Sequence, residues 1–305
     1  MTDNLWQKLE DKLGLGKVKV KESLALHTTF QIGGPADYYF EAKTNEELIK
    51  AYQAAKDLDL PFLILGGGSN VLIGDKGFRG LVVKNKTKGI KIVNVRGKIG
   101  PCLNGAKLNV KDVLVEVEAG VPFNQFVRFA IDEGLGGLEE FLGLPGTVGG
   151  AVIGNAHWQD KTVSQFIFSQ KTYDLKILLS VIFQLQKEDK DFLWQKARQA
   201  IEHRQKTQPT GASAGCIFKN IKKSQALRIG TTDLTTSAGF VIEASGLKGE
   251  KFGNLQISPQ HANFMINLGG AKAKDVLNLI KEVKEKVKEK FNLELEEEIV
   301  KIGEF

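Results

Sequence analysis

Apolar side chains recur at helical spacing in four segments of the chain. The first, MTDNLWQKLEDKLG at residues 1–14, is short and charged throughout. The second follows the capping-box pattern Thr44-Asn-Glu-Glu47 and carries Leu48, Ala51, Tyr52, Ala55 and Leu58. The third runs from Pro122 to Gly134. The fourth, residues 271–291, places Val276, Ile280, Val283, Val287 and Phe291 on one face, with i,i+4 lysine–glutamate pairs on the other. These patterns predict four amphipathic helices.

Strand-like sequence separates these helices. Residues 24–40 and 161–187 are rich in β-branched and aromatic side chains, and PFLIL at residues 61–65 is a short apolar run. Residues 85–118 alternate lysine, glycine and β-branched side chains, as a hairpin does. A polar helix followed by Gln208-Pro209 indicates a domain boundary near residues 190–210. The order of elements predicts a βαβ-like unit early in the chain and an α+β unit in the last hundred residues.

Two glycine-rich segments are the first candidates for ligand binding. Gly66-Gly67-Gly68-Ser69-Asn70 follows the strand PFLIL, and a second block ends in LPGTVGGAVIGN. Glycine removes the Cβ and permits positive φ, so such loops let several backbone N–H groups converge on a pyrophosphate. A plain tight turn at residues 66–70, and strand-edge bulges at Gly146, Gly149 and Gly150, are the alternatives. Because the two blocks occur together, we favour an extended dinucleotide as the ligand.

Composition narrows the class of protein. The chain has 305 residues, 42% of them hydrophobic, a net charge of +6 and a pI near 9. Its lysines are dispersed among glutamates with no basic stripe, so we expect no nucleic-acid partner. Cys102 and Cys216 lie far apart, which argues against a disulfide framework, and no His/Cys/Asp cluster has metal spacing. We see no signal peptide or apolar run of spanning length, and expect a cytoplasmic protein.

Six segments together resemble the UDP-N-acetylenolpyruvoylglucosamine reductase (MurB) family, in its shorter type. HTTFQIGGPADYYF, LPFLILGGGSNVLIGDKGFRGLVV and GLEEFLGLPGTVGGAVIGNA look like its FAD-binding part. QPTGASAGCIFKN and GFVIEASGLKGEKFGNLQISPQHANFMINLGG, with LELEEEIVKIG, look like its C-terminal substrate domain. The resemblance implies an α+β fold, with an FAD-binding module of the vanillyl-alcohol-oxidase-like (PCMH-type) fold in two subdomains. It implies an N-terminal extension at 1–23, the FAD-binding module at 24–195 and the substrate domain at 196–305.

The resemblance also implies a reaction and its cofactors. The family passes hydride from NADPH through non-covalently bound FAD to UDP-N-acetylglucosamine enolpyruvate, giving UDP-N-acetylmuramate for peptidoglycan synthesis. We therefore expect a UDP-sugar substrate and a monomeric enzyme. The residues expected to hold FAD are Gly66, Gly67, Gly68, Ser69, Asn70, Gly120, Pro145, Gly146, Thr147, Gly149, Gly150 and Asn155.

The segment SAGCIFKN is where the family carries its proton donor, a serine or cysteine after the glycine. Here that residue is Cys216. A thiol with a reference pKa of about 8.5 stays mostly protonated at neutral pH and can donate. The alternative is a buried structural cysteine. Lys219 and Asn220 match substrate-side residues of the family, although Lys219 also fits a solvated strand edge.

A second acid–base group is expected in LELEEEIVKIG, where the family register selects Glu298. Glu294, Glu296 and Glu297 are the alternatives, because a run of glutamates commonly forms a solvated face. Alternation along a strand puts Glu296 on the same face as Glu298 and makes it the natural rival.

The family's Tyr-Arg pair has no clear counterpart, since no arginine lies between Arg128 and Arg198. The nearest alignment sets Gln170 and Lys171 at that position. Lys171 would supply positive charge, but not the planar guanidinium with which an arginine forms two parallel hydrogen bonds. The alternative is that Lys171 is an exposed surface residue without a catalytic role. Two other functions therefore stay open: an FAD-linked sugar or alcohol oxidase, and a non-catalytic flavin or UDP-sugar binder.

Overall fold

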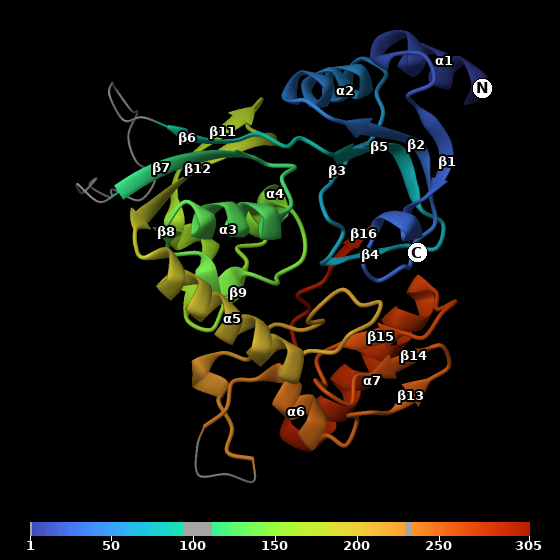
Figure 1. Ribbon diagram of the computed structural model, residues 1–305. Coiled ribbons are helices and arrows are strands. Elements are labelled where there is room, and N and C mark those ends of the chain that lie inside the picture. Colours follow the sequence, from blue (N-terminus) through green and yellow to red (C-terminus); the bar gives the residue numbers. More distant parts are fainter. Residues whose placement is uncertain (1, 94–111, 230–233) are drawn as a thin grey trace. The chain divides into compact units, whose positions relative to one another are not determined.

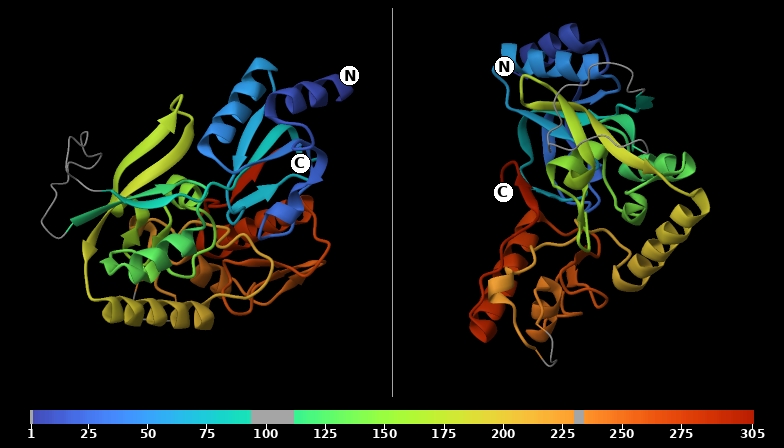
Figure 2. Two further views of the ribbon diagram at one scale, coloured as in Figure 1. Left: turned by 45° about the horizontal axis from the view of Figure 1, so that its top comes forward. Right: turned by 90° about the vertical axis from the view of Figure 1, so that its left-hand side faces the viewer.

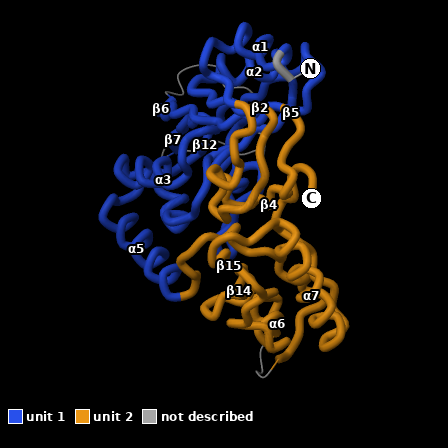
Figure 3. Tube along the Cα trace, turned by 90° about the vertical axis from the view of Figure 1, so that its right-hand side faces the viewer, with its two compact units in different colours: residues 1–19, 39–67, 81–206 blue, residues 20–38, 68–80, 207–305 orange. Residues whose placement is uncertain are grey.

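A computed structural model describes residues 2–93, 112–229 and 234–305, and the chain divides into two compact units (Figure 3). Unit 1 comprises residues 1–19, 39–67 and 81–206, and unit 2 comprises residues 20–38, 68–80 and 207–305. Three separate stretches of sequence therefore build each unit. The domain limits at residues 23 and 195 remain a prediction. Cys102 and most of the turn of the hairpin predicted for residues 85–118 lie outside the described residues.

An antiparallel five-stranded sheet forms the centre of unit 1 (Figure 1). Its order is β11 (Ile167–Tyr173), β12 (Ile177–Lys187), β7 (Asp112–Glu118) and β6 (Ile90–Val93), and β8 (Leu135–Gly136) pairs with the end of β12. The pairing of β6 with β7 confirms the predicted hairpin partners. Strands were likewise expected in residues 161–187, where β11 and β12 form.

Helix α3 (Phe123–Asp132) supplies the aromatic part of the core of unit 1. Its face of Phe123, Phe126, Val127, Ala130 and Ile131 is buried, as its spacing predicts. The ring of Phe126 packs on Phe183 of β12 with centroids 4.7 Å apart. Each such buried side chain stabilises the fold by about 1.5–3 kcal/mol. Helix α5 (Lys190–Thr207) is the polar helix expected near the boundary.

The N-terminal part of unit 1 contains helices α1 (Thr2–Leu13) and α2 (Asn45–Asp57), which contact each other (Figure 1). The predicted cap of α2 forms, because the Thr44 side chain accepts a hydrogen bond from the Glu47 N–H at 3.2 Å. After Pro61, β3 (Phe62–Leu65) pairs in parallel with β5 (Phe78–Asn85). The order of this sheet is β1 (Lys19–Ser23), β2 (Pro35–Ala42), β5 and β3, and the division between units runs through β2 and β5.

Unit 2 is built around helix α7 (Ala273–Phe291). Its predicted apolar face is buried at Val276, Ile280, Val283 and Val287, and Phe291 packs against the same core. Both predicted ion pairs form, Lys281–Glu285 at 3.8 Å and Lys286–Glu282 at 3.6 Å. Its C-terminal part also contains α6 (Ala238–Ala244) and a sheet of β13 (Lys251–Phe252), β14 (Leu255–Ile257) and β15 (Met265–Asn267).

Segments from the first eighty residues complete unit 2. Strand β4 (Val71–Ile73) pairs in parallel with β16 (Val300–Ile302). The carboxylate of Asp75 accepts hydrogen bonds from the N–H groups of Ala273 at 2.8 Å and Lys274 at 3.1 Å. A residue distant in sequence thus caps the start of α7. Phe30, Ile32 and Leu72 belong to the same buried core as α7.

Two predictions about local structure are wrong. The second glycine block is not a bare loop after a strand, because it contains a 3₁₀ turn (Glu139–Phe141) and opens helix α4 (Val148–Ile153). Thr147 caps this helix by accepting from the Gly150 N–H at 3.3 Å, which draws the glycines into a helical turn. Residues 292–299 do not form a strand, so strict alternation of Glu296 and Glu298 does not apply. The other short elements are η1 (Leu24–His27), β9 (His157–Trp158), β10 (Lys161–Thr162), η3 (Val163–Phe166) and η4 (Lys223–Gln225).

Candidate active site

The two glycine blocks meet inside unit 1. A Cβ built on Gly66 would lie 2.5 Å from the Thr147 hydroxyl oxygen, and one on Gly67 would overlap the backbone of Gly146. Gly146 itself has a φ of +111°, which favours glycine. The loops predicted to act together therefore touch, and glycine is required at residues 66 and 67 for this contact. From the sequence, we expected glycine at residue 67 because a side chain there would block the approach of a pyrophosphate. In the structure, glycine is needed there because a side chain would overlap Gly146.

The other unit 1 residues predicted to hold the cofactor shape these loops. The N–H of Gly120 donates to the Thr87 hydroxyl at 3.0 Å, and the N–H of Gly149 donates to the Ala119 carbonyl at 2.8 Å. Asn155, at φ +44°, accepts from the Ser164 N–H at 3.1 Å. Pro145 precedes the positive-φ Gly146 and is exposed. The N–H groups of Gly120, Gly149 and Gly150 already have protein acceptors, and Gly120 and Gly149 are buried, so these N–H groups hold the loops together.

The second half of the first loop, Gly68-Ser69-Asn70, belongs to unit 2. A Cβ on Gly68, at φ +70°, would overlap the carbonyl oxygen of His27. Asn70 is tied to the C-terminal segment, because its side-chain amide donates to the Glu298 carbonyl at 3.3 Å and its own carbonyl accepts from the Val300 N–H at 3.1 Å. A predicted cofactor residue and the predicted catalytic acid are thus linked directly.

Cys216 and Glu298 lie together in unit 2. The N–H of Glu298 donates to the carbonyl of Ile217 at 2.8 Å, and Cys216 forms a β-bridge with Phe264. Burial and the negative charge of Glu298 raise the pKa of the Cys216 thiol to about 12, against a smaller opposite effect of a hydrogen bond with the Asn263 side chain. The thiol is therefore held protonated over the physiological range, as a proton donor requires.

The four clustered glutamates have different partners. Glu294 pairs with Lys288 at 2.9 Å, and Glu296 lies 3.6 Å from Lys219 and 3.8 Å from Lys222. Glu297 pairs with Lys284 at 2.6 Å and Lys301 at 2.7 Å, and these lysines keep its pKa low against the opposing effect of burial. Glu298 is the glutamate whose charge acts on Cys216. The geometry therefore favours Glu298 over its rival Glu296 as the partner of the thiol.

Curated relatives match nearly the whole chain. A protein of Syntrophobacter fumaroxidans is 35% identical over 92% of this chain and 82% of its own length. A protein of Halalkalibacterium halodurans is 34% identical over 96% of both. Both carry the name UDP-N-acetylenolpyruvoylglucosamine reductase. The chain belongs to this family.

Two family models and a solved structure agree with that assignment to the UDP-N-acetylenolpyruvoylglucosamine reductases. Residues 36–170 match an FAD binding domain, and residues 205–302 match the C-terminal domain of the reductase. The crystal structure of the reductase (MurB) from Thermus caldophilus has a TM-score of 0.70 and 28% identity, covering 93% of this chain and 98% of that one. The predicted α+β class and FAD-dependent oxidoreductase type are therefore confirmed.

The residues of unit 1 fit the FAD that this reductase family uses. Gly66, Gly67 and Gly146 are each half-exposed and lie where the two loops touch. They present backbone without side chains, which a pyrophosphate can approach closely. Gly66, Gly67, Gly146 and the helix-capping Thr147 are the unit 1 residues that would hold FAD.

The predicted substrate-side residues lie beside Cys216 in sequence but differ in their contacts. Lys219 is exposed, and its N–H donates to the Glu296 carbonyl at 2.8 Å while its ammonium group pairs with the Glu296 carboxylate. Asn220 is exposed and accepts from the Ala238 N–H at 3.2 Å, at the start of α6. The Lys219 ammonium group is thus already paired, and a substrate anion would compete with Glu296 for it.

The segment that we aligned with the expected Tyr-Arg pair is a tight hairpin (Figure 2). Strands β11 and β12 are joined at Asp174 and Leu175, whose φ values are +51° and +54°. Lys171 is exposed on β11, opposite Ser180, and its charge lowers the pKa of Glu116 and of Glu46 as a minor cause. Lys171 belongs to unit 1, whereas Cys216 and Glu298 belong to unit 2.

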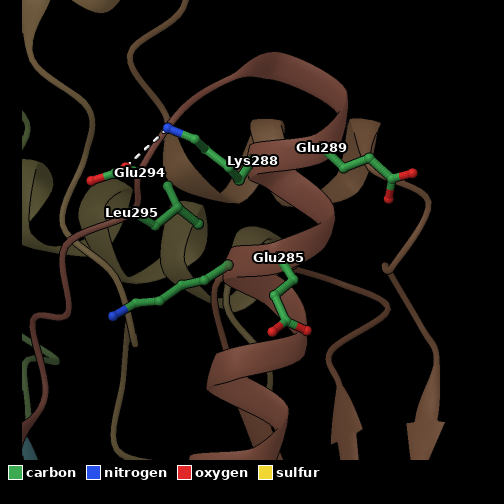
Figure 4. Close-up of a pocket in the computed structure, with 6 residues that line it drawn as sticks. Glu285, Lys288, Glu289, Glu294 and Leu295 are labelled. Atoms are coloured by element: carbon green, nitrogen blue, oxygen red, sulfur yellow. Dashed lines mark hydrogen bonds and ion pairs between the residues drawn. The ribbon is translucent and has the colours of Figure 1, made fainter.

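Grooves elsewhere on unit 2 do not contain the predicted site. One of them is a charged groove beside α7, lined by Lys284, Glu285, Lys288, Glu289, Glu294 and Leu295 (Figure 4). Its lysines pair with Glu297 and Glu294. Within the described ranges, no group of three or more His, Cys, Asp and Glu side chains is placed to bind a metal. Every helix in the described part of the chain is too short or too polar to cross a lipid bilayer.

Asn263 is the residue of this site to which sequence reasoning assigned no role. It is almost fully buried at 3% exposure and contacts the strand-like segment that carries Cys216. Its segment, QHANFMIN, contributed to the family resemblance, but nothing in its sequence indicated which side chain would reach the thiol.

Proposed function

We propose that this chain catalyses the NADPH-dependent reduction of UDP-N-acetylglucosamine enolpyruvate to UDP-N-acetylmuramate, a step of peptidoglycan precursor synthesis. The observation that carries the proposal is the meeting of Cys216 and Glu298, which come from separate segments, in a chain of the reductase family. Bound FAD would supply the hydride carrier between NADPH and the substrate.

The proposal gives the chain's own residues the following roles. Cys216, held protonated, would give its proton to the substrate carbon next to the carboxylate as negative charge builds there. Glu298, whose main chain is fixed on Ile217 and Asn70, would keep the thiol protonated until that moment. Lys219 and Asn220 would contact the UDP-sugar, and Lys171 would balance the substrate carboxylate.

One observation favours a second candidate, a non-catalytic flavin or UDP-sugar binder. The tight β11–β12 turn leaves no loop for a Tyr-Arg pair between residues 167 and 187, and Lys171 there is exposed. A sugar or alcohol oxidase has less support, because the Cys216 and Glu298 segments resemble the reductase's substrate domain.

An absorbance spectrum of the purified protein, followed by NADPH oxidation with and without the enolpyruvyl substrate, tests the proposal. A reductase shows a flavin spectrum and oxidises NADPH in proportion to added substrate. A yellow protein that binds the UDP-sugar without turnover is the binder, and oxygen consumption with simple sugars identifies the oxidase. The proposal also includes a cytoplasmic location, where NADPH and UDP-sugars are made, and a monomer, which size-exclusion chromatography tests.

A further inference from the structure

Thr29 joins the first glycine loop (residues 66–70) to the segment that carries Cys216. Its N–H donates to the Gly68 carbonyl at 3.0 Å, and its hydroxyl donates to the Ser213 carbonyl at 2.7 Å. The hydroxyl has one proton, and the Gly68 carbonyl lies farther from its oxygen, at 3.4 Å, so the proton points to Ser213. Ser213 precedes Cys216 by three residues. Thr29 therefore bonds both segments at once, and Thr29, Gly68 and Ser213 all belong to unit 2.

Asn267 holds both ends of this link in place. Its backbone N–H donates to the carbonyl of Ala212, the residue before Ser213, at 2.9 Å. Its side-chain amide donates to the carbonyl of Phe30, the residue after Thr29, at 3.1 Å. Phe30 is fully buried in the core of unit 2, and Asn267 is buried as well. The Thr29 hydroxyl and the Ser213 carbonyl are therefore brought together by fixed backbone, so little conformational entropy opposes their bond.

The same glycine loop is also bonded to Glu298. The Asn70 side-chain amide donates to the Glu298 carbonyl at 3.3 Å. Gly68 is buried, and a Cβ there would overlap the His27 carbonyl, so the loop lies directly on the segment of Thr29. The loop is thus bonded to both segments that carry the predicted acid–base groups.

In the proposed reaction, a hydride and a proton must reach adjacent carbons of one substrate. The glycine loops would place the hydride carrier, and Cys216 would give the proton. A misplacement of about 1 Å can cost about a hundredfold in rate. We propose that Thr29 is a positioning residue that fixes the Cys216 segment relative to the glycine loop that would hold FAD. The inference rests on the proposed function of the chain.

Thr29→Val keeps the shape of the side chain and the N–H bond to Gly68, but it removes the hydroxyl. In stopped-flow mixing, this variant should slow reoxidation of the reduced flavin by the enolpyruvyl substrate about tenfold or more. Reduction of the flavin by NADPH should be unchanged, because that step does not use Cys216. Thr29→Ser retains the hydroxyl and should restore the rate. Thr29→Ala, which also lacks the hydroxyl, serves where the valine variant does not fold, and the same slowing is expected.

Hydrogen exchange, measured by mass spectrometry without substrate, gives a readout that is independent of turnover. The N–H groups of Ile217 and Phe218 bond to Asn263 and report on the Cys216 segment. In Thr29→Val they should exchange about threefold to tenfold faster, the effect of losing one hydrogen bond that holds this segment.

Thr28→Val is the matched control. Thr28 is the neighbouring threonine and is buried, and its hydroxyl contacts carbonyls of its own segment, those of Ala25 and Ile32, each at 3.4 Å. Its reoxidation and exchange should match those of wild type. A wild-type rate of either process in Thr29→Val overturns the role of Thr29, as does an equal change in Thr28→Val. Unchanged reoxidation in Cys216→Ala instead overturns the proposed function, a separate result because hydrogen exchange needs neither substrate nor turnover.

Discussion

The backbone N–H of Glu298 donates to the carbonyl of Ile217, the residue that follows Cys216, at 2.8 Å. This bond joins segments far apart in the sequence and brings the two predicted acid–base groups to one place. Because the contact is made by main-chain atoms, either side chain can be changed without breaking it. The two residues can therefore be tested separately.

Cys216→Ala should separate the two half-reactions. NADPH should still bleach the flavin, because that step needs no proton donor for the substrate. Reoxidation by the enolpyruvyl substrate should slow by about two to four decades, the usual size of general acid catalysis. Cys216→Ser should recover part of the rate, since a hydroxyl occupies the same place. Equal turnover of wild type and Cys216→Ala, measured by stopped-flow absorbance, would reduce Cys216 to a packing role.

Glu298→Gln should lower kcat far more than substrate binding, because its charge acts on Cys216. Glu296→Gln is the control, since that carboxylate pairs with exposed Lys219 and Lys222. Its effect on stability should stay within about 0.5 kcal/mol. Steady-state kinetics of the two variants decide which glutamate is the catalytic carboxylate. Normal activity of Glu298→Gln together with an inactive Glu296→Gln would assign that role to Glu296.

Gly67→Ala should lose flavin and lower the melting temperature together, because the new Cβ overlaps Gly146 and forces the two loops apart. Gly150→Ala is matched to it in the same block. Its Cβ would lie 3.6 Å from the Thr147 hydroxyl, an ordinary contact, so the melting temperature should hold, and any loss of flavin would come from the predicted place of Gly150 at the cofactor. Flavin absorbance per protein and a thermal melt measure both effects. Full flavin in a stable Gly67→Ala protein would contradict the loop contact.

Lys171→Met should slow substrate reduction by about a hundredfold, the loss typical of one group that stabilises developing charge. Lys171→Arg should retain most of the activity, because the charge remains. Lys176→Met is the matched control, since Lys176 is also exposed on this hairpin. Turnover of Lys171→Met equal to that of Lys176→Met would leave Lys171 a surface residue.

Alkaline pH should destabilise the wild type through Cys216. The thiol pKa is about 12 in the folded protein, above the ordinary thiol value of about 8.5. From about pH 9 to 12 the unfolded chain releases this proton while the folded protein keeps it, so the free energy of unfolding falls as pH rises, by at most ~1.4 kcal/mol per unit. Cys216→Ser should lack this loss. Urea unfolding of both proteins at pH 7.5 and 10 measures the difference, and parallel behaviour would contradict the assignment.

Local pattern predicted the helices well because each buries one face. The apolar spacing of residues 276–287, the Thr44 cap and the ion pairs of α7 all depend on neighbours a few residues away. That Cys216 and Glu298 share one site was predicted only through the family resemblance. Composition and periodicity alone left four glutamates equivalent.

Long-range contacts explain what the sequence left undetermined. Asp75 caps α7 from another segment. Asn263 reaches the Cys216 segment because a loop closed by Ser258 directs it there. Each depends on where distant backbone lies, and neither periodicity nor residue type carries that information.

The pairing of β4 with β16 also constrains how the protein is made. Val71–Ile73 leaves the ribosome early, but its partner Val300–Ile302 is translated only after every residue between them. At about 5–20 residues per second, β4 waits roughly ten seconds or more for its partner. Unit 2 therefore closes late, and Leu72, fully buried in the finished protein, waits for core partners that lie mostly between residues 214 and 299. A nascent chain stalled before residue 300 should be the form of the protein that is most sensitive to proteolysis.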